Sequence, residues 1–123
     1  MAKATGVGGV FLRARDPQAL YAWYEKHLGL PMSPGGIMIP AEQHRAVVVV
    51  AFFPKGSAYF PVEQPTMVNF QVDDLDALLD QLEADGVTVD PKRDSTEYGK
   101  FGWITDPEGN RVELYQPPDE GAA

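Results

Sequence analysis

The chain has 123 residues, of which 44% are hydrophobic and 23% charged, and this size and composition predict a single domain spanning residues 1–123. Its net charge of −8 would repel phosphate backbones and anionic lipids, so we expect neither nucleic acid nor a membrane as a partner. The absence of cysteine excludes disulfides and thiolate chemistry, and the lack of a signal-peptide pattern or an apolar run of about 20 residues leads us to expect a cytoplasmic protein.

The first half of the chain predicts a strand, a helix and a later strand. Apolar side chains alternate with others over residues 10–16, which favours a strand. Asp16 can cap a helix, and Pro17 suits the first position of that helix. Apolar side chains then recur at helical spacing over residues 17–28. The apolar run at residues 46–53 predicts the strand that closes this unit.

The second half repeats this order. Residues 68–74 alternate like the first strand, and leucines at helical spacing predict a helix over residues 75–85. Pro107 and Gly109 favour a turn that joins strands at residues 101–105 and 111–115 into a hairpin.

We therefore predict a duplicated α+β domain. Module one spans about residues 8–60 and module two about residues 66–117, with the Pro-rich residues 61–65 as a linker. Residues 118–123 are expected to form a flexible tail.

Strand alternation separates a core face from a second face. The predicted core side chains, under the helices, are Val10, Leu12, Ala14, Val68, Phe70, Val72, Val112 and Leu114. The opposite face carries Gly9, Phe11, Arg13, Met67, Asn69, Gln71, Arg111, Glu113 and Tyr115. This mixture of apolar and polar groups could line a ligand cleft, or it could be an ordinary solvated sheet face.

The second face offers candidate substrate-binding groups. Asn69 and Gln71 can orient a carbonyl or amide, and an apolar wall would come from Phe11, Phe53, Met67, Trp103 and Tyr115. For each wall residue, packing in the core is the alternative.

Two other features have simpler explanations. The segment Tyr98, Gly99 and Lys100 could be a lid or a surface turn. His27 and His44 are expected to be structural or surface residues, because neither belongs to a ligand motif.

Three segments together resemble the glyoxalase, bleomycin-resistance and extradiol-dioxygenase family, also called vicinal oxygen chelate proteins. They are LRARDPQALYAWYEKHLGL, VNFQVDDLDALLDQLEADGV and YGKFGWITDPEGNRVELYQP, and the resemblance spans about residues 8 to 117. It implies two tandem βαβββ modules that form a curved mixed sheet around a cleft, with the helices outside. It also implies a homodimer and places Arg13 where similar glyoxalases bind a substrate carboxylate; an ion pair with an acid across the sheet is the alternative for Arg13.

The resemblance also implies four metal-ligand positions. They fall on Gly9, near Val49, on Met67 and on Glu113, and only Glu113 can bind a hard cation. Because transition-metal sites ordinarily need about three protein ligands, we expect neither a bound divalent metal nor another cofactor.

The sequence leaves three roles open for Glu113: a catalytic base, a partner for a cationic ligand, or an ion pair with Arg13 or Arg111. Our leading interpretation is a metal-independent protein that binds a small molecule in its cleft. The alternatives are a lyase or isomerase, similar to lactoylglutathione lyase or a dioxygenase, that uses Glu113 as base or metal ligand, and a drug-sequestering resistance protein of the bleomycin type.

Overall fold

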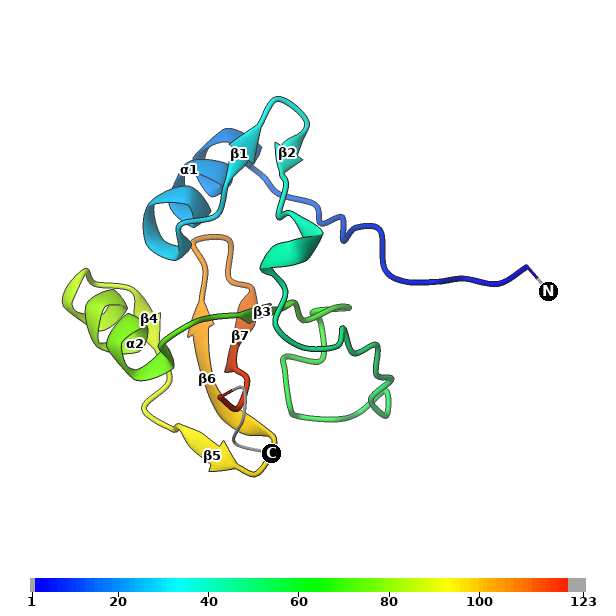
Figure 1. The fold of residues 1–123 in the computed structure, drawn as a ribbon. Coiled ribbons are helices and arrows are strands. Elements are labelled where there is room, and N and C mark those ends of the chain that lie inside the picture. Colours follow the sequence, from blue (N-terminus) through cyan, green and yellow to red (C-terminus); the bar gives the residue numbers. More distant parts are fainter. Residues whose placement is uncertain (1, 120–123) are drawn as a thin grey trace.

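The computed structural model describes residues 2–119, and Figure 1 shows helices beside a mixed sheet. The expected tail at residues 118–123 therefore lies largely outside the described residues. The main sheet has the strand order β3 (Asn69–Gln71), β7 (Arg111–Gln116), β6 (Gly99–Thr105) and β4 (Thr88–Val89), with β5 (Asp94–Thr96) also on β6. Strand β3 runs parallel to β7, and the other pairs are antiparallel. The α+β class is confirmed.

The predicted hairpin is present as β6 and β7. Its turn closes through two backbone hydrogen bonds, from Asp106 N to Asn110 O at 2.9 Å and from Gly109 N to Asp106 O at 3.0 Å. Gly109 has a φ of 87°, a value that glycine adopts without a steric cost. The resulting register places Trp103 opposite Glu113.

Helix α2 (Leu75–Ala84) packs on one face of this sheet. The side chain of Asp74 caps it by accepting from Ala77 N at 3.1 Å. Three of its leucines are almost completely buried, together with three side chains of the hairpin. This core consists of Leu75, Leu79, Leu82, Ile104, Val112 and Leu114.

Helix α1 (Pro17–Leu28) has the predicted bounds and also packs on module two. Its buried Tyr24 belongs to the same core, and the rings of Tyr24 and Phe70 lie 5.9 Å apart. The Tyr24 hydroxyl donates to Asp106 Oδ2 at 2.8 Å. Ahead of the helix, the Glu108 carboxylate accepts from the Arg15 and Asp16 backbone N–H groups at 3.1 and 3.0 Å.

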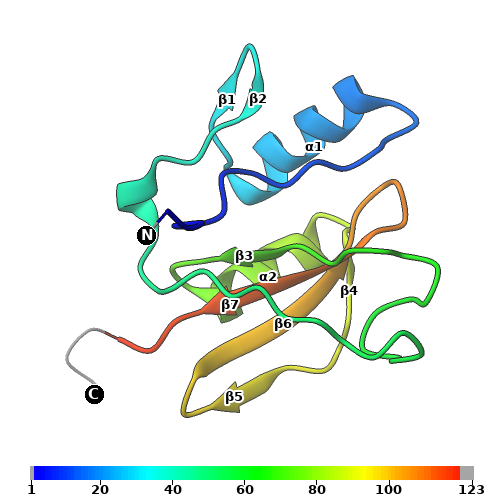
Figure 2. The same ribbon diagram turned by 90° about the vertical axis from the view of Figure 1, so that its right-hand side faces the viewer.

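Two predicted strands of module one are absent. Residues 10–16 and 46–53 form no sheet ladder among the described residues, and Figure 2 draws both as coil. Val10 and Leu12 were expected in the core but are about half exposed, at 51% and 52%. A strand needs a partner to satisfy its backbone groups, and residues 2–119 of this single chain supply none for either segment.

Module one instead contains short elements that the sequence analysis did not predict. Strands β1 (Met32–Ser33) and β2 (Gly36–Ile37) form a small antiparallel sheet, followed by the short helix η1 (Ala41–Gln43). Module two alone has its predicted strand, helix and following strands in place. Within residues 2–119, neither helix has the length and apolar character needed to cross a bilayer.

Gly99, at the start of β6, tests this packing. Its φ of 128° is unfavourable for other residues, and a Cβ would meet the carbonyl oxygen of Gln116 and lie 2.8 Å from Cε1 of Tyr115. We expect Gly99→Ala to lower the free energy of unfolding by more than about 2 kcal/mol, the sum of overpacking and backbone strain. Urea unfolding followed by circular dichroism measures it.

Gly109→Ala is the matched control. It also has a positive φ, but a Cβ there would meet nothing within 4 Å, so its cost should be limited to about 1 kcal/mol of backbone strain. Equal losses for the two variants would contradict the role assigned to close packing at Gly99.

Candidate functional site

The carboxylate of Glu113 is the centre of the candidate site. Its residue is only 8% exposed, yet the described residues offer it no ion-pair partner within salt-bridge distance. Trp103 Nε1 donates to Oε2 at 2.9 Å, and Asn69 Nδ2 donates to Oε1 at 2.7 Å. Both donors sit directly opposite Glu113 on the neighbouring strands β6 and β3. The sheet register therefore fixes this part of the site.

Tyr59 supplies a third donor from outside the sheet. Its hydroxyl donates to Glu113 Oε2. Its ring stacks on Phe53, with centroids 5.1 Å apart and planes at 25°, and meets Trp103 edge-on at 6.1 Å. Burial, followed by the hydrogen bond to Glu113, raises the pKa of Tyr59 above its ordinary value of 10.0. The phenol is therefore a neutral donor near pH 7.

An open hollow of about 490 Å³ lies beside these aromatic rings. Residues 50–55 and 60–62 supply much of its wall, and Met67 also lines it. Phe53 connects the hollow to the Glu113 site, because it lines the hollow and also stacks on Tyr59. Glu113 and Tyr59 are not themselves part of that lining. Of the predicted wall residues, Phe53 and Met67 thus line the hollow, while Trp103 is buried beneath Tyr59.

Other predicted binding residues have structural contacts. Gln71 Oε1 accepts from Arg45 N at 2.9 Å, and its Nε2 donates to Ala46 O at 3.2 Å. Its amide therefore holds the chain at residues 45 and 46. The Tyr115 hydroxyl donates to Tyr98 O at 2.8 Å, and its ring stacks on Phe101 at 4.9 Å.

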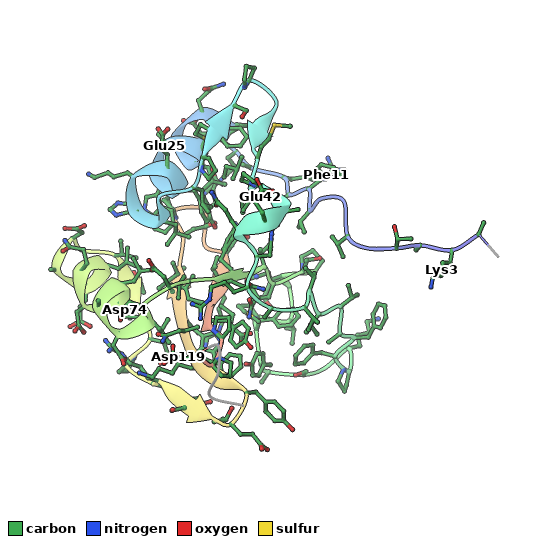
Figure 3. The ribbon with its side chains drawn as sticks, in the orientation of Figure 1. Lys3, Phe11, Glu25, Glu42, Asp74 and Asp119 are labelled. Atoms are coloured by element: carbon green, nitrogen blue, oxygen red, sulfur yellow. The ribbon has the colours of Figure 1, made fainter. Side chains whose placement is uncertain are left out.

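The arginines predicted beside Glu113 do not pair with it. Arg111 Nη2 bonds Asp90 Oδ2 at 3.0 Å, and the Arg111 guanidinium lies 5.3 Å from the Trp103 ring centroid. Arg13 is exposed and belongs to the segment that forms no strand. Phe11, on the same segment, is 96% exposed, and Figure 3 shows it away from the sheet. Of the three roles left open for Glu113, the ion pair with Arg13 or Arg111 is not the one observed within the described residues, because its carboxylate accepts hydrogen bonds from neutral groups.

The predicted lid is a turn. Gly99 and Lys100 belong to β6, and Tyr98 lies in the short connection from β5, where its N–H donates to Thr96 Oγ1 at 3.1 Å. The alternative of a surface turn is the one observed.

The residues around Glu113 do not fit a metal centre. Its three partners are an indole, an amide and a phenol that point hydrogens at the carboxylate, and the other family positions are Gly9, Val49 and Met67. No group of three His, Cys, Asp or Glu side chains within residues 2–119 is arranged to hold a metal. The two histidines have structural contacts. The ring centroids of His27 and Trp23 lie 5.0 Å apart, and His44 Nδ1 lies 3.3 Å from Ala41 O.

Sequence reasoning missed Tyr59 and Asp106. Tyr59 lies between the predicted strand 46–53 and the Pro-rich linker, where periodicity gives no orientation for a side chain. The one available signal was the adjacent aromatic pair Tyr59 and Phe60 in an otherwise turn-rich segment. Asp106 begins the DPEGN turn, and an aspartate at that position commonly bonds the backbone that follows it.

Comparison with known proteins agrees with this fold. Residues 6–114 match the model of the Glyoxalase/Bleomycin resistance protein/Dioxygenase superfamily. Because this match spans most of the sequence, the chain belongs to that superfamily. No curated protein matches the sequence.

Several solved structures are similar. TnmS3, an antibiotic-binding protein from Streptomyces sp. CB03234, is 25% identical with a TM-score of 0.57, covering 94% of this chain and 100% of that one. A protein from the mobile metagenome of V. Pseudocholerae is 20% identical with a TM-score of 0.63, covering 97% and 99%. Lactoylglutathione lyase from Agrobacterium tumefaciens is 21% identical with a TM-score of 0.53, covering 91% and 96%. The two structures with lower sequence identity, 20% and 21%, support the fold alone.

Two phenols should ionise later than the other tyrosines. Burial, then the hydrogen bond to Asp106, raises the pKa of Tyr24, and Tyr59 is raised as described above. A phenol whose pKa is raised by folding stabilises the folded state at pH values below its ordinary pKa of 10.0. This stabilisation is lost as the pH rises above 10.0. We expect Tyr24→Phe and Tyr59→Phe each to remove one late-ionising phenol from an ultraviolet titration of tyrosinate.

The free energy of unfolding should also depend on these two phenols at high pH. The free energy of unfolding of the wild-type protein should fall as the pH rises above 10.0, and less steeply in Tyr24→Phe. Tyr98→Phe is the control, since this ring is 70% exposed. A Tyr24→Phe titration with the same late-ionising population as the wild type would contradict the assignment.

Proposed function

We propose that the protein binds a small organic molecule in the hollow beside Phe53 and Met67, next to Glu113, without a bound metal. The observation that carries this proposal is the state of Glu113: a buried carboxylate held by neutral donors and linked to the hollow through Tyr59 and Phe53. Such a site can position a ligand by shape and by a few directed hydrogen bonds. The likeness to an antibiotic-binding protein supports sequestration as the biological role.

Native mass spectrometry of protein purified without added metal tests this function. We expect an organic molecule to be retained and transition metals to be absent. Glu113→Gln, which keeps the side-chain size but removes the charge, should reduce the retained fraction. Glu83→Gln, at an exposed position of α2, is the control and should retain it fully. A transition metal bound in equal amount to the protein would overturn the proposal.

A lyase or isomerase is the second candidate. The observation that favours it is the direct hydrogen bond between Tyr59 and Glu113, which brings a protonated phenol and a carboxylate together where one could donate and the other accept a proton. If wild-type protein converts the retained molecule, and Glu113→Gln binds it with unchanged affinity but without turnover, the enzymatic function is favoured over sequestration.

We also propose that the protein is a homodimer. Two segments rich in strand-forming residues lie exposed without sheet partners in residues 2–119. They include Val10, Phe11, Leu12, Val47, Val48, Val49, Val50 and Phe52. Exposed apolar surface of this extent marks an interface, and β3 leaves one edge of the sheet open to a further strand. A second copy offers the same segments and the same edge, so one two-fold arrangement covers both.

Light scattering after size-exclusion chromatography tests the assembly. We expect about twice the chain mass for the wild type, and the chain mass for Phe11→Asp and Val49→Asp, because each puts a charge into the covered surface. Met38→Asp is the control, at an exposed apolar residue outside both segments, and should stay dimeric. A wild-type protein that is monomeric at about 100 μM, well above the Kd of a stable dimer, would rule the assembly out.

A further inference from the structure

The side chain of Tyr59 points to the chemistry of the ligand. We infer that Tyr59 occupies the place of a ligand group, and that the ligand is a planar aromatic molecule whose neutral hydroxyl replaces the Tyr59 hydroxyl on Glu113. This inference rests on the proposed function and specifies the class of molecule bound.

The first argument concerns which of the three donors can move away from the Glu113 carboxylate. Asn69 and Trp103 lie on strands β3 and β6, and the pairing of these strands with β7 keeps the backbones of both residues directly beside Glu113. Tyr59 instead belongs to residues 54–66, which contain no helix or strand. The Tyr59 bond to Glu113 is therefore the one that can be exchanged.

The hydrogen bonds near Tyr59 show which other contacts would break if its hydroxyl left Glu113. Ser57 N donates to Pro54 O at 2.9 Å, which closes a turn within this segment. On the other side of Tyr59, Gln64 bonds the backbone of Arg111 in both directions, at 2.8 and 2.9 Å, and attaches the segment to the sheet. Among residues 58–63, the Tyr59 hydroxyl makes the one described side-chain hydrogen bond to the sheet. Displacing the phenol thus needs no other bond to the sheet to break.

The second argument concerns charge. A buried carboxylate that loses a donor pays a large desolvation cost, so the incoming group must itself donate a hydrogen bond. A carboxylate ligand would be repelled by Glu113. An ammonium ligand would add a third cation near Trp103, where Arg111 and Lys92 lie 5.3 and 5.9 Å from the ring centroid, each already paired with an aspartate. The Tyr59 donor that the ligand replaces is itself neutral. A neutral hydroxyl satisfies Glu113 without either conflict.

The third argument concerns shape. The Tyr59 ring lies nearly parallel to Phe53 and edge-on to Trp103, which is a favourable arrangement for a flat aromatic ring. Phe60 lies edge-on to Phe53 at 5.6 Å and extends the aromatic wall into the hollow. The hollow of about 490 Å³ is within the size range of sites for drug-sized molecules. A fused ring system therefore fits better than a single phenol.

Three probes of one ring system separate these features: 2-naphthol, 2-methoxynaphthalene and 2-naphthylmethylammonium. Isothermal titration calorimetry gives their Kd, and the Trp103 indole N–H resonance reports contact near Glu113. Trp23→Phe assigns that resonance, since the chain has two tryptophans. We expect 2-naphthol to bind at least roughly tenfold more tightly than the ether, which leaves Glu113 without its donor.

Variants then test the replacement itself. Tyr59→Phe removes the competing hydroxyl but keeps the ring, so the Kd of 2-naphthol should fall roughly fivefold. Tyr98→Phe is the matched control at an exposed tyrosine and should leave the Kd unchanged. Glu113→Gln should shrink the preference for 2-naphthol over its ether, since a neutral amide is a weaker acceptor.

Contrary results also distinguish this inference from the proposed function. Equal affinity for the naphthol and the ether, or an unchanged Kd in Tyr59→Phe, overturns the replacement of Tyr59. Tighter binding of the ammonium probe overturns the neutral-hydroxyl class but leaves small-molecule binding in place. If no probe binds while native mass spectrometry still detects a retained molecule, the inference alone fails. If neither detects binding, both fail.

Discussion

The hydrogen bonds of the buried Asp106 carboxylate hold together the parts of this chain on which the site depends. Oδ1 accepts from the backbone N–H groups of Glu108 and Asn110, both at 2.9 Å, and these bonds shape the turn between β6 and β7. Oδ2 accepts from Asn110 Nδ2 at 2.9 Å and from the Tyr24 hydroxyl at 2.8 Å. One carboxylate therefore closes the hairpin and also fastens α1 to module two.

The closed hairpin determines what surrounds the second buried carboxylate. A shift of one residue in register would turn Glu113 toward the opposite face of the sheet, whereas the observed register puts Trp103 and Asn69 directly beside it. These two donors on the strands supply two of the hydrogen bonds that the carboxylate accepts. Tyr59, from residues 54–66 outside the sheet, supplies a third. In the function that we propose, the donors on the strands hold the carboxylate and Tyr59 is exchanged for the ligand, so no metal is needed to place it.

The sequence predicted local secondary structure well, but it did not predict contacts between residues far apart in the chain. Both helices and the hairpin carry local signals, such as Asp74 before α2 and Gly109 in the turn, and all three formed with bounds close to those expected. Strand alternation also put Asn69 on the face of Glu113. Residues 46–53 failed as a strand because a ladder depends on a partner that local composition does not specify. Tyr59 escaped notice because its carboxylate partner is 54 positions away.

Because Tyr59 is attached to the chain, it competes with every free molecule at a high local concentration, of about millimolar order for a short flexible connection. A free ligand reaches Glu113 only when its affinity and abundance together exceed that internal competitor. Under the inference that Tyr59 is replaced by a ligand, small phenols present at low concentration, free tyrosine among them, are expected to be rejected even though their hydroxyl group fits. Residues 54–66 would then set an affinity threshold that a molecule passes by additional stacking along Phe53 and Phe60.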